Sequence, residues 1–184
     1  MRALRAAFAQ ASAGRGSLAF ITGEPGIGKS RLVRELTGYA RGAGAVAVTG
    51  RAVEGGSSAP YRPLTEALLQ ILRDRPVLSG GASRRGCPRS RAIVPGIGPS
   101  REAGGPEDAV VSPVARAEGV IRLIRWLGTG AGLLIALEDL HWADPDTPAV
   151  LEYLADNVGG ERILFVATSG DEPIGRGRAG TQAG

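Results

Sequence analysis

The sequence predicts an α/β fold of three layers, in which a parallel β-sheet is covered by helices on both faces. Short apolar segments alternate along the chain with segments of helical periodicity, as in other parallel-sheet proteins. Residues 133–137 are apolar on both faces, as a central strand of such a sheet requires. A glycine-rich octapeptide also separates the first apolar segment from a helical one, at a position where such sheets bind ligands.

The first half of the chain accounts for two strands and the helices between them. The expected strands are 17–22 and 45–50, and the segments expected to be amphipathic or helical are 1–13, 31–41 and 63–72. Gly42 and Gly44 end the helix that follows the octapeptide.

The second half contains two further helices and two further strands. Residues 75–112 are rich in Gly and Pro and poor in large apolar side chains, which predicts an irregular or disordered insertion. The expected elements after it are a helix at 114–127, a strand at 133–137, a helix at 145–158 and a strand at Ile163–Thr168. Asp144 is placed to cap the helix at 145–158, and Pro145 suits its first position. We therefore expect one domain over 1–170 and a disordered tail over 171–184.

The octapeptide has the phosphate-loop pattern G-x-x-x-x-G-K-[ST]. The residues expected to bind the nucleotide are Gly23, Glu24, Pro25, Gly26, Ile27, Gly28, Lys29 and Ser30, together with Arg31. Lys29 is the only lysine among the 22 basic residues, and its slim ammonium can reach between phosphates where a guanidinium is too bulky. The Ser30 hydroxyl is expected to bind Mg²⁺, and the helix that follows adds the positive end of its dipole.

Two adjacent acids, Glu138 and Asp139, directly follow the apolar segment 133–137. At the carboxyl end of a parallel strand, both side chains are expected to enter the crevice where ligands bind. One carboxylate can hold Mg²⁺ and the other can orient or deprotonate an attacking water. The pair therefore predicts the catalytic and metal-binding half of a nucleotide hydrolase.

Composition excludes several other classes of protein. The net charge is only +4 and the arginines are scattered, so no nucleic-acid groove is predicted. No run of 18 apolar residues is free of charge, so no membrane span is expected. A single cysteine, Cys87, and a single histidine, His141, exclude an intrachain disulfide and argue against a zinc site. These features predict a cytoplasmic protein.

Residues 23–34 and 138–147 together resemble the nucleotide-binding domain of STAND-class, AAA-like ATPases, the Orc1-like ATPase modules of large LuxR-family regulators. The resemblance extends over most of 1–170, including Gly50-Arg51 and the segment 60–63. It implies a P-loop NTPase core with strand order 5-1-4-3-2 that binds ATP and Mg²⁺ and controls an attached output module.

Individual roles follow from the same resemblance. It makes Lys29 the Walker A lysine that contacts phosphate and Ser30 the magnesium hydroxyl. Glu138 and Asp139 match the Walker B acids, of which the first usually coordinates the metal; which of the two serves as base stays open. His141 and Trp142 lie near the acids in the family, and we expect them to pack the turn between strand and helix.

The chain also departs from the family in ways that affect the expected function. Gly170 stands where the family commonly has an arginine that senses the γ-phosphate. No candidate fifth strand follows Thr168, so we expect a truncated core whose exposed sheet edge pairs with a partner protein or with itself. The predicted function is a slow ATP-hydrolysing regulatory switch. A dedicated ATPase, a P-loop kinase, a DNA-binding regulator and a non-hydrolysing truncated fragment are the alternatives.

Overall fold

A computed structural model describes residues 1–54, 60–74, 113–127 and 130–170 of the 184-residue chain. The predicted insertion at 75–112 and the predicted tail at 171–184 lie outside the described residues. No helix in the described part is long and apolar enough to cross a membrane.

The centre of the fold is a four-stranded, all-parallel sheet with the strand order β1-β4-β3-β2. The strands are β1 (Ser17–Ile21), β2 (Val46–Arg51), β3 (Leu133–Glu138) and β4 (Ile163–Thr168). All four were predicted, β4 with the bounds observed. The order reproduces four positions of the implied order 5-1-4-3-2, and the fifth strand has no counterpart among the described residues.

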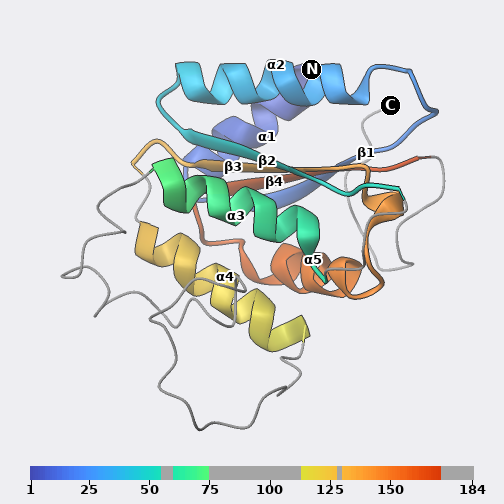
Figure 1. Ribbon diagram of the computed structural model, residues 1–184. Coiled ribbons are helices and arrows are strands. Elements are labelled where there is room, and N and C mark those ends of the chain that lie inside the picture. Colours follow the sequence, from blue (N-terminus) through green and yellow to red (C-terminus); the bar gives the residue numbers. More distant parts are fainter. Residues whose placement is uncertain (55–59, 75–112, 128–129, 171–184) are drawn as a thin grey trace, which may run out of the picture.

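Helices cover both faces of the sheet, which confirms the three-layer prediction (Figure 1). One layer holds α1 (Arg2–Ser12) and α2 (Lys29–Gly42). The other holds α3 (Arg62–Asp74), α4 (Pro113–Leu127) and α5 (Asp146–Asn157), with α4 packed against α5.

Strands β3 and β4 are buried on both faces because their side chains alternate between two apolar clusters. Leu134, Ala136, Leu164 and Val166 pack against α1 and α2, together with Phe8 and Leu36. The intervening side chains pack against α3, α4 and α5; they are Leu133, Ile135, Leu137, Ile163, Phe165 and Ala167. A register slip of one residue would exchange these two sets, so burial on both faces fixes the pairing of the two strands.

Strand β2 lies at one edge of the sheet, and polar side chains satisfy its outer backbone groups. The side-chain amide of Gln70 donates to the Thr49 carbonyl at 2.7 Å and accepts from the Thr49 N–H at 3.3 Å, as a neighbouring strand would. The Arg41 guanidinium donates to the Ala47 carbonyl through Nε and Nη2 at 3.2 and 2.7 Å. These contacts leave β2 little capacity to pair with a further strand.

Gly50 lies within β2, although the sequence indicated that the strand ends there. A Cβ on Gly50 would lie 1.7 Å from the carbonyl oxygen of Pro63, so only glycine allows the first turn of α3 to approach the strand this closely. The strand continues through Gly50 to Arg51, one residue beyond the predicted end, and both residues pair with β3. This extra residue brings a guanidinium to the carboxyl edge of the sheet.

Candidate functional site

The loop between β1 and α2 is shaped by three glycines in left-handed conformations. Gly23, Gly26 and Gly28 have φ angles of 149°, 83° and 105°, which L side chains rarely adopt. Gly28 precedes the first residue of α2, and no side chain caps the free N–H groups of that helix. The loop thus ends in an uncapped helix amino terminus, which favours negative charge.

Lys29 is buried, with 9% of its surface exposed. Its ammonium donates to the carbonyl oxygens of Gly23 and Glu24 at 2.5 and 2.9 Å, so the side chain folds back across the loop. A buried ammonium needs hydrogen-bond acceptors, and its own loop provides two here. The cation is thereby held beside the loop N–H groups.

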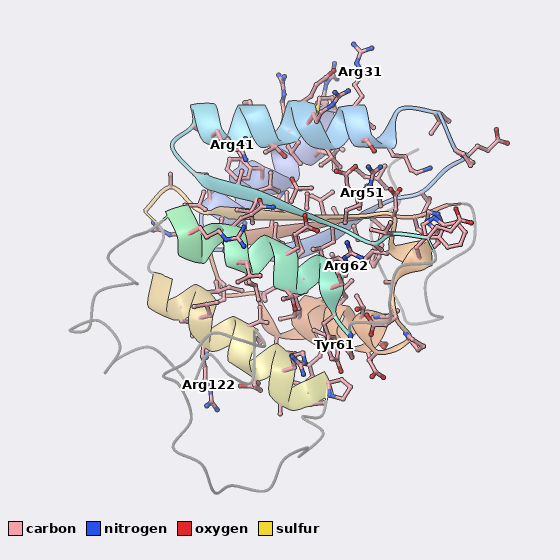
Figure 2. The ribbon with its side chains drawn as sticks, in the orientation of Figure 1. Arg31, Arg41, Arg51, Tyr61, Arg62 and Arg122 are labelled. Carbon is pink, nitrogen blue, oxygen red and sulfur yellow. The ribbon has the colours of Figure 1, made fainter. Side chains whose placement is uncertain are left out.

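The remaining residues of the phosphate-loop pattern are more accessible. Glu24, Pro25 and Gly26 are exposed, and Ile27 has 71% of its surface exposed. Ser30 lies half-buried in the first turn of α2. The Arg31 side chain points away from the sheet and forms an ion pair with Glu35 at 3.0 Å (Figure 2).

The two acids emerge at the carboxyl end of β3, as predicted. Glu138 is the last residue of β3, and its Oε2 atom is buried without a hydrogen-bond partner in the described part of the chain. Asp139 follows in a left-handed conformation with φ 59°, and its N–H donates to Thr168 Oγ1 at 2.9 Å. The strained backbone and this bond fix the direction in which the Asp139 carboxylate leaves the strand.

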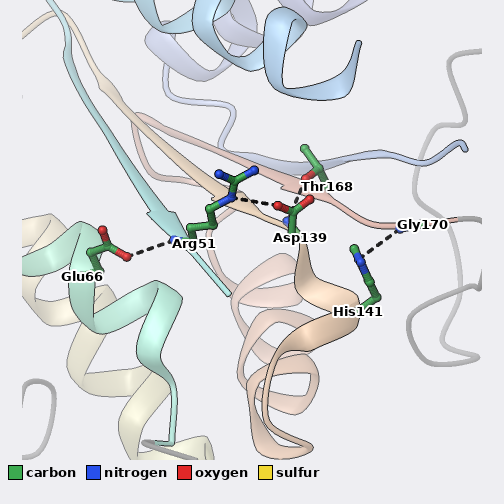
Figure 3. Close-up of polar contacts among 6 residues, drawn as sticks. All are labelled: Arg51, Glu66, Asp139, His141, Thr168 and Gly170. Atoms are coloured by element: carbon green, nitrogen blue, oxygen red, sulfur yellow. Dashed lines mark hydrogen bonds and ion pairs between the residues drawn. The ribbon is translucent and has the colours of Figure 1, made fainter. Parts of the chain in front are cut away.

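A third charged side chain, that of Arg51, contacts the acid pair (Figure 3). The sequence predicted no role for it. Arg51 Nε donates to Asp139 Oδ2 at 2.8 Å. The hydrogen bond to Asp139, followed by the charge of Asp139, raises the pKa of Arg51. The two residues are 88 positions apart and meet because Arg51 is paired with Glu138 in the β2–β3 register.

His141 and Trp142 do not pack the turn as expected. Both are exposed, Trp142 to 46%, and their rings lie 4.9 Å apart. The turn is instead filled by Leu140, which is 3% exposed. The His141 Nδ1 atom accepts a hydrogen bond from the Gly170 N–H at 3.3 Å, which connects the turn after β3 to the chain two residues beyond β4 (Figure 3).

Asp144 caps α5, as predicted, and also binds a distant loop. Its Oδ1 accepts from the N–H groups of Asp146 and Thr147 at 3.2 and 3.1 Å. Its Oδ2 accepts from the N–H of Tyr61 at 2.7 Å. Tyr61 is buried with φ 61°, and the Arg116 guanidinium lies 4.1 Å from its ring centroid. One carboxylate thus joins the start of α3 to the start of α5.

Among the described residues, no group of three or more His, Cys, Asp or Glu side chains could hold a metal ion. Mg²⁺ does not need such a group, because it commonly takes one or two carboxylates and completes its shell with phosphate oxygens and water. The unpartnered Oε2 of Glu138 is an acceptor that suits this chemistry.

The chain is similar to a protein family and to a bacterial relative among known proteins. A family model described as the AAA ATPase domain matches residues 1–166. An uncharacterized protein of Rhizobium meliloti (strain 1021) is 26% identical over 178 residues, which cover 85% of this chain. The match covers only 16% of the relative, so the chain spans a small part of the relative's length.

We predict that Asp144→Ala lowers the free energy of unfolding by about 1–2 kcal/mol, because it removes the cap of α5. It also leaves the Tyr61 N–H without its acceptor. Asp144→Asn keeps an acceptor oxygen, so its free energy of unfolding is expected to fall by less. Urea denaturation measures both variants, with Asp156→Ala at the exposed end of α5 as the control. An Asp144→Ala variant as stable as the control would contradict the prediction.

Proposed function

Because the chain belongs to the AAA ATPase domain family of ATP-binding P-loop NTPases, we propose that it binds Mg-ATP at residues 23–31 and acts as a slow ATP-hydrolysing regulatory switch. The observation that carries the proposal is the position of Lys29. This buried cation lies at the end of a loop with three left-handed glycines, beside an uncapped helix terminus. The acid pair lies at the same carboxyl edge of the sheet.

The phosphates would take over the hydrogen bonds that Lys29 now donates to its own loop. The Gly23 and Glu24 carbonyls, which now accept from the ammonium, are dipoles without net charge. A phosphate oxygen is a stronger acceptor because it carries charge. Since the Arg31 side chain points away from the sheet, we assign its phosphate contact to the backbone N–H.

Mg²⁺ would be held by Ser30, Glu138 and Asp139, and when bound it would supply positive charge against the phosphate oxygens. Glu138 is the better candidate for direct contact with the metal, since its Oε2 has no protein partner within the described residues. Asp139, whose backbone is fixed by Thr168, would then orient the attacking water and accept its proton at a carboxylate oxygen.

Slow hydrolysis is proposed because no side chain extends from Gly170 toward the site. Its N–H is bound to His141, and no guanidinium reaches the acids from this position after β4. Developing negative charge on a transferred phosphoryl group therefore lacks one cation on this side. No observation favours a fast ATPase or a kinase.

We place this switch in a larger STAND-type regulator of the LuxR family, working in the cytoplasm. The chain corresponds to 16% of the length of the Rhizobium relative, a proportion that suits a module attached to an output region. A protein partner or a second copy would bind at β1, because β1 pairs only with β4 among the described residues. The other edge strand, β2, is covered by polar side chains instead.

We expect Lys29→Ala and Lys29→Arg to weaken ATP binding by at least about tenfold. A charge-assisted hydrogen bond contributes about 1.5–3 kcal/mol, and a factor of ten requires about 1.4. Isothermal titration calorimetry measures the affinity, and Arg34→Ala on the exposed side of α2 is the control. Equal ATP affinity of the wild-type chain and the Lys29 variants would contradict the placing of the ATP site at residues 23–31.

Asp139→Asn is expected to suppress hydrolysis while ATP stays bound, because the amide cannot accept the proton of the attacking water. The wild-type chain is expected to turn over more slowly than about 1 per second, the lower end of the range for dedicated enzymes. Phosphate release measures the rate, and calorimetry measures the binding. A wild-type rate of tens per second would contradict the switch proposal.

A further inference from the structure

Arg51 is the one described residue whose guanidinium contacts the acid pair, and the proposed function gives it no role. The described part of the chain contains two other ion pairs. Arg31 and Glu35 lie on the same helix, and Arg125 and Glu161 lie at the opposite end of the sheet, before β4 begins. An exposed ion pair contributes little to stability, so the place of Arg51 calls for another explanation.

The contact between Arg51 and Asp139 is made through a single nitrogen. Nε donates to Asp139 Oδ2 at 2.8 Å, whereas Nη1 and Nη2 have no hydrogen-bond partner among the described residues. Figure 3 shows these two nitrogens on the side of the guanidinium that faces away from α3. A planar pair of free N–H donors matches the oxygens of a phosphate group.

The backbone under Arg51 is fixed, so only its side chain can change partner. The Arg51 N–H donates to Glu66 Oε2 at 3.1 Å, and the preceding Gly50 is pressed against Pro63 of α3. The side chain itself is 59% exposed, so rotation meets little packing. The backbone of Asp139 is also held in place, because its N–H donates to Thr168 Oγ1.

The net charge around the Arg51 guanidinium determines when it changes its partner. Without nucleotide, Arg51 is the cation that balances Asp139. Bound magnesium would balance the acid pair instead, and a terminal phosphate would bring new negative charge to the same edge of the sheet. The guanidinium would then lose its attraction to Asp139 and gain one to the phosphate.

We propose that Arg51 exchanges Asp139 for the terminal phosphate when a nucleoside triphosphate binds, and that this contact makes the site prefer the triphosphate over the diphosphate. The inference rests on the proposed function, because it needs the phosphates to lie between Lys29 and the acids. Arg51 would reach the phosphate from β2, which lies on the other side of β3 from β4, so the position of Gly170 after β4 still lacks a cation.

The test compares the affinities of the 184-residue chain for Mg-ATP and Mg-ADP by calorimetry. Arg51→Gln is expected to lower the preference for ATP over ADP by about tenfold, the loss of one charge-assisted hydrogen bond. ADP affinity is expected to stay within about twofold, since ADP lacks the terminal phosphate. Arg125→Gln is the matched control, because it removes an ion pair made through Nε by a side chain that is also 59% exposed.

A second measurement follows the side chain directly. In the ¹⁵N-labelled wild type, the Nε–H resonance of Arg51 is expected to move on addition of Mg-ATP and to move less with Mg-ADP, while that of Arg125 stays in place. If Arg51→Gln does not fold, Arg51→Ala and this resonance carry the test.

The two proposals fail in different ways. A wild-type chain that binds neither nucleotide refutes the proposed function. A wild-type chain that binds both, with the ATP-to-ADP ratio unchanged in Arg51→Gln, refutes only the role of Arg51. An Arg51→Gln variant whose affinities for ATP and ADP fall by the same factor also contradicts the role of Arg51, because the contact would then not involve the terminal phosphate.

Discussion

The structure depends on the burial of β3 and β4 on both faces. Six apolar side chains of these strands face α3, α4 and α5, and four face α1 and α2. A shift of either strand by one residue would turn each set toward the opposite helix layer. Because the register cannot shift, the residues that follow the strands are fixed relative to one another. Glu138, Asp139 and Thr168 meet at one edge for this reason.

The carboxyl edge of the sheet combines groups that folding alone does not favour. Lys29 is a buried cation bound only to neutral carbonyls, Glu138 has a buried oxygen without a partner in the described residues, and Asp139 has a left-handed backbone. Each of these features costs free energy in a folded chain. The free energy of the apolar core offsets these costs, and a ligand with phosphate oxygens and a metal ion would provide partners for Lys29 and Glu138. We take this concentration of strain and unmatched charge at one edge as the physical signature of the site.

The sequence predicted the layers, all four strands and the helices between them because burial leaves a clear pattern. Residues 163–167 are apolar throughout, as is typical of a strand buried on both faces. Asp144 was predicted as a cap because its place before Pro145 is a local signal. The expected nucleotide roles of residues 23–31, Glu138 and Asp139 stay predictions.

Features that depend on long-range geometry could not be predicted. Gly50 looked like the end of β2, yet it pairs with β3 inside the strand, and position 50 needs glycine because α3 approaches it too closely for a Cβ. The pairing of Arg51 with Asp139 follows from a register between segments 88 residues apart. His141 and Trp142 were expected to fill a turn, but Leu140 fills it and leaves both rings exposed. In each case the outcome depends on neighbours that are distant in the sequence, and local patterns of residue type do not show which neighbours these are.

The most direct test of the central claim is a titration of the ¹⁵N-labelled chain with Mg-ATP, followed by the backbone amide resonances. If the loop after β1 holds the phosphates, the largest shifts will be those of Gly26, Gly28, Lys29 and Ser30, because phosphate oxygens accept from N–H groups at this uncapped helix terminus. Residues at the opposite end of the sheet, such as Glu161 and Arg162, will hardly change. Shifts that are absent from the loop, or centred on another part of the surface, would contradict the account.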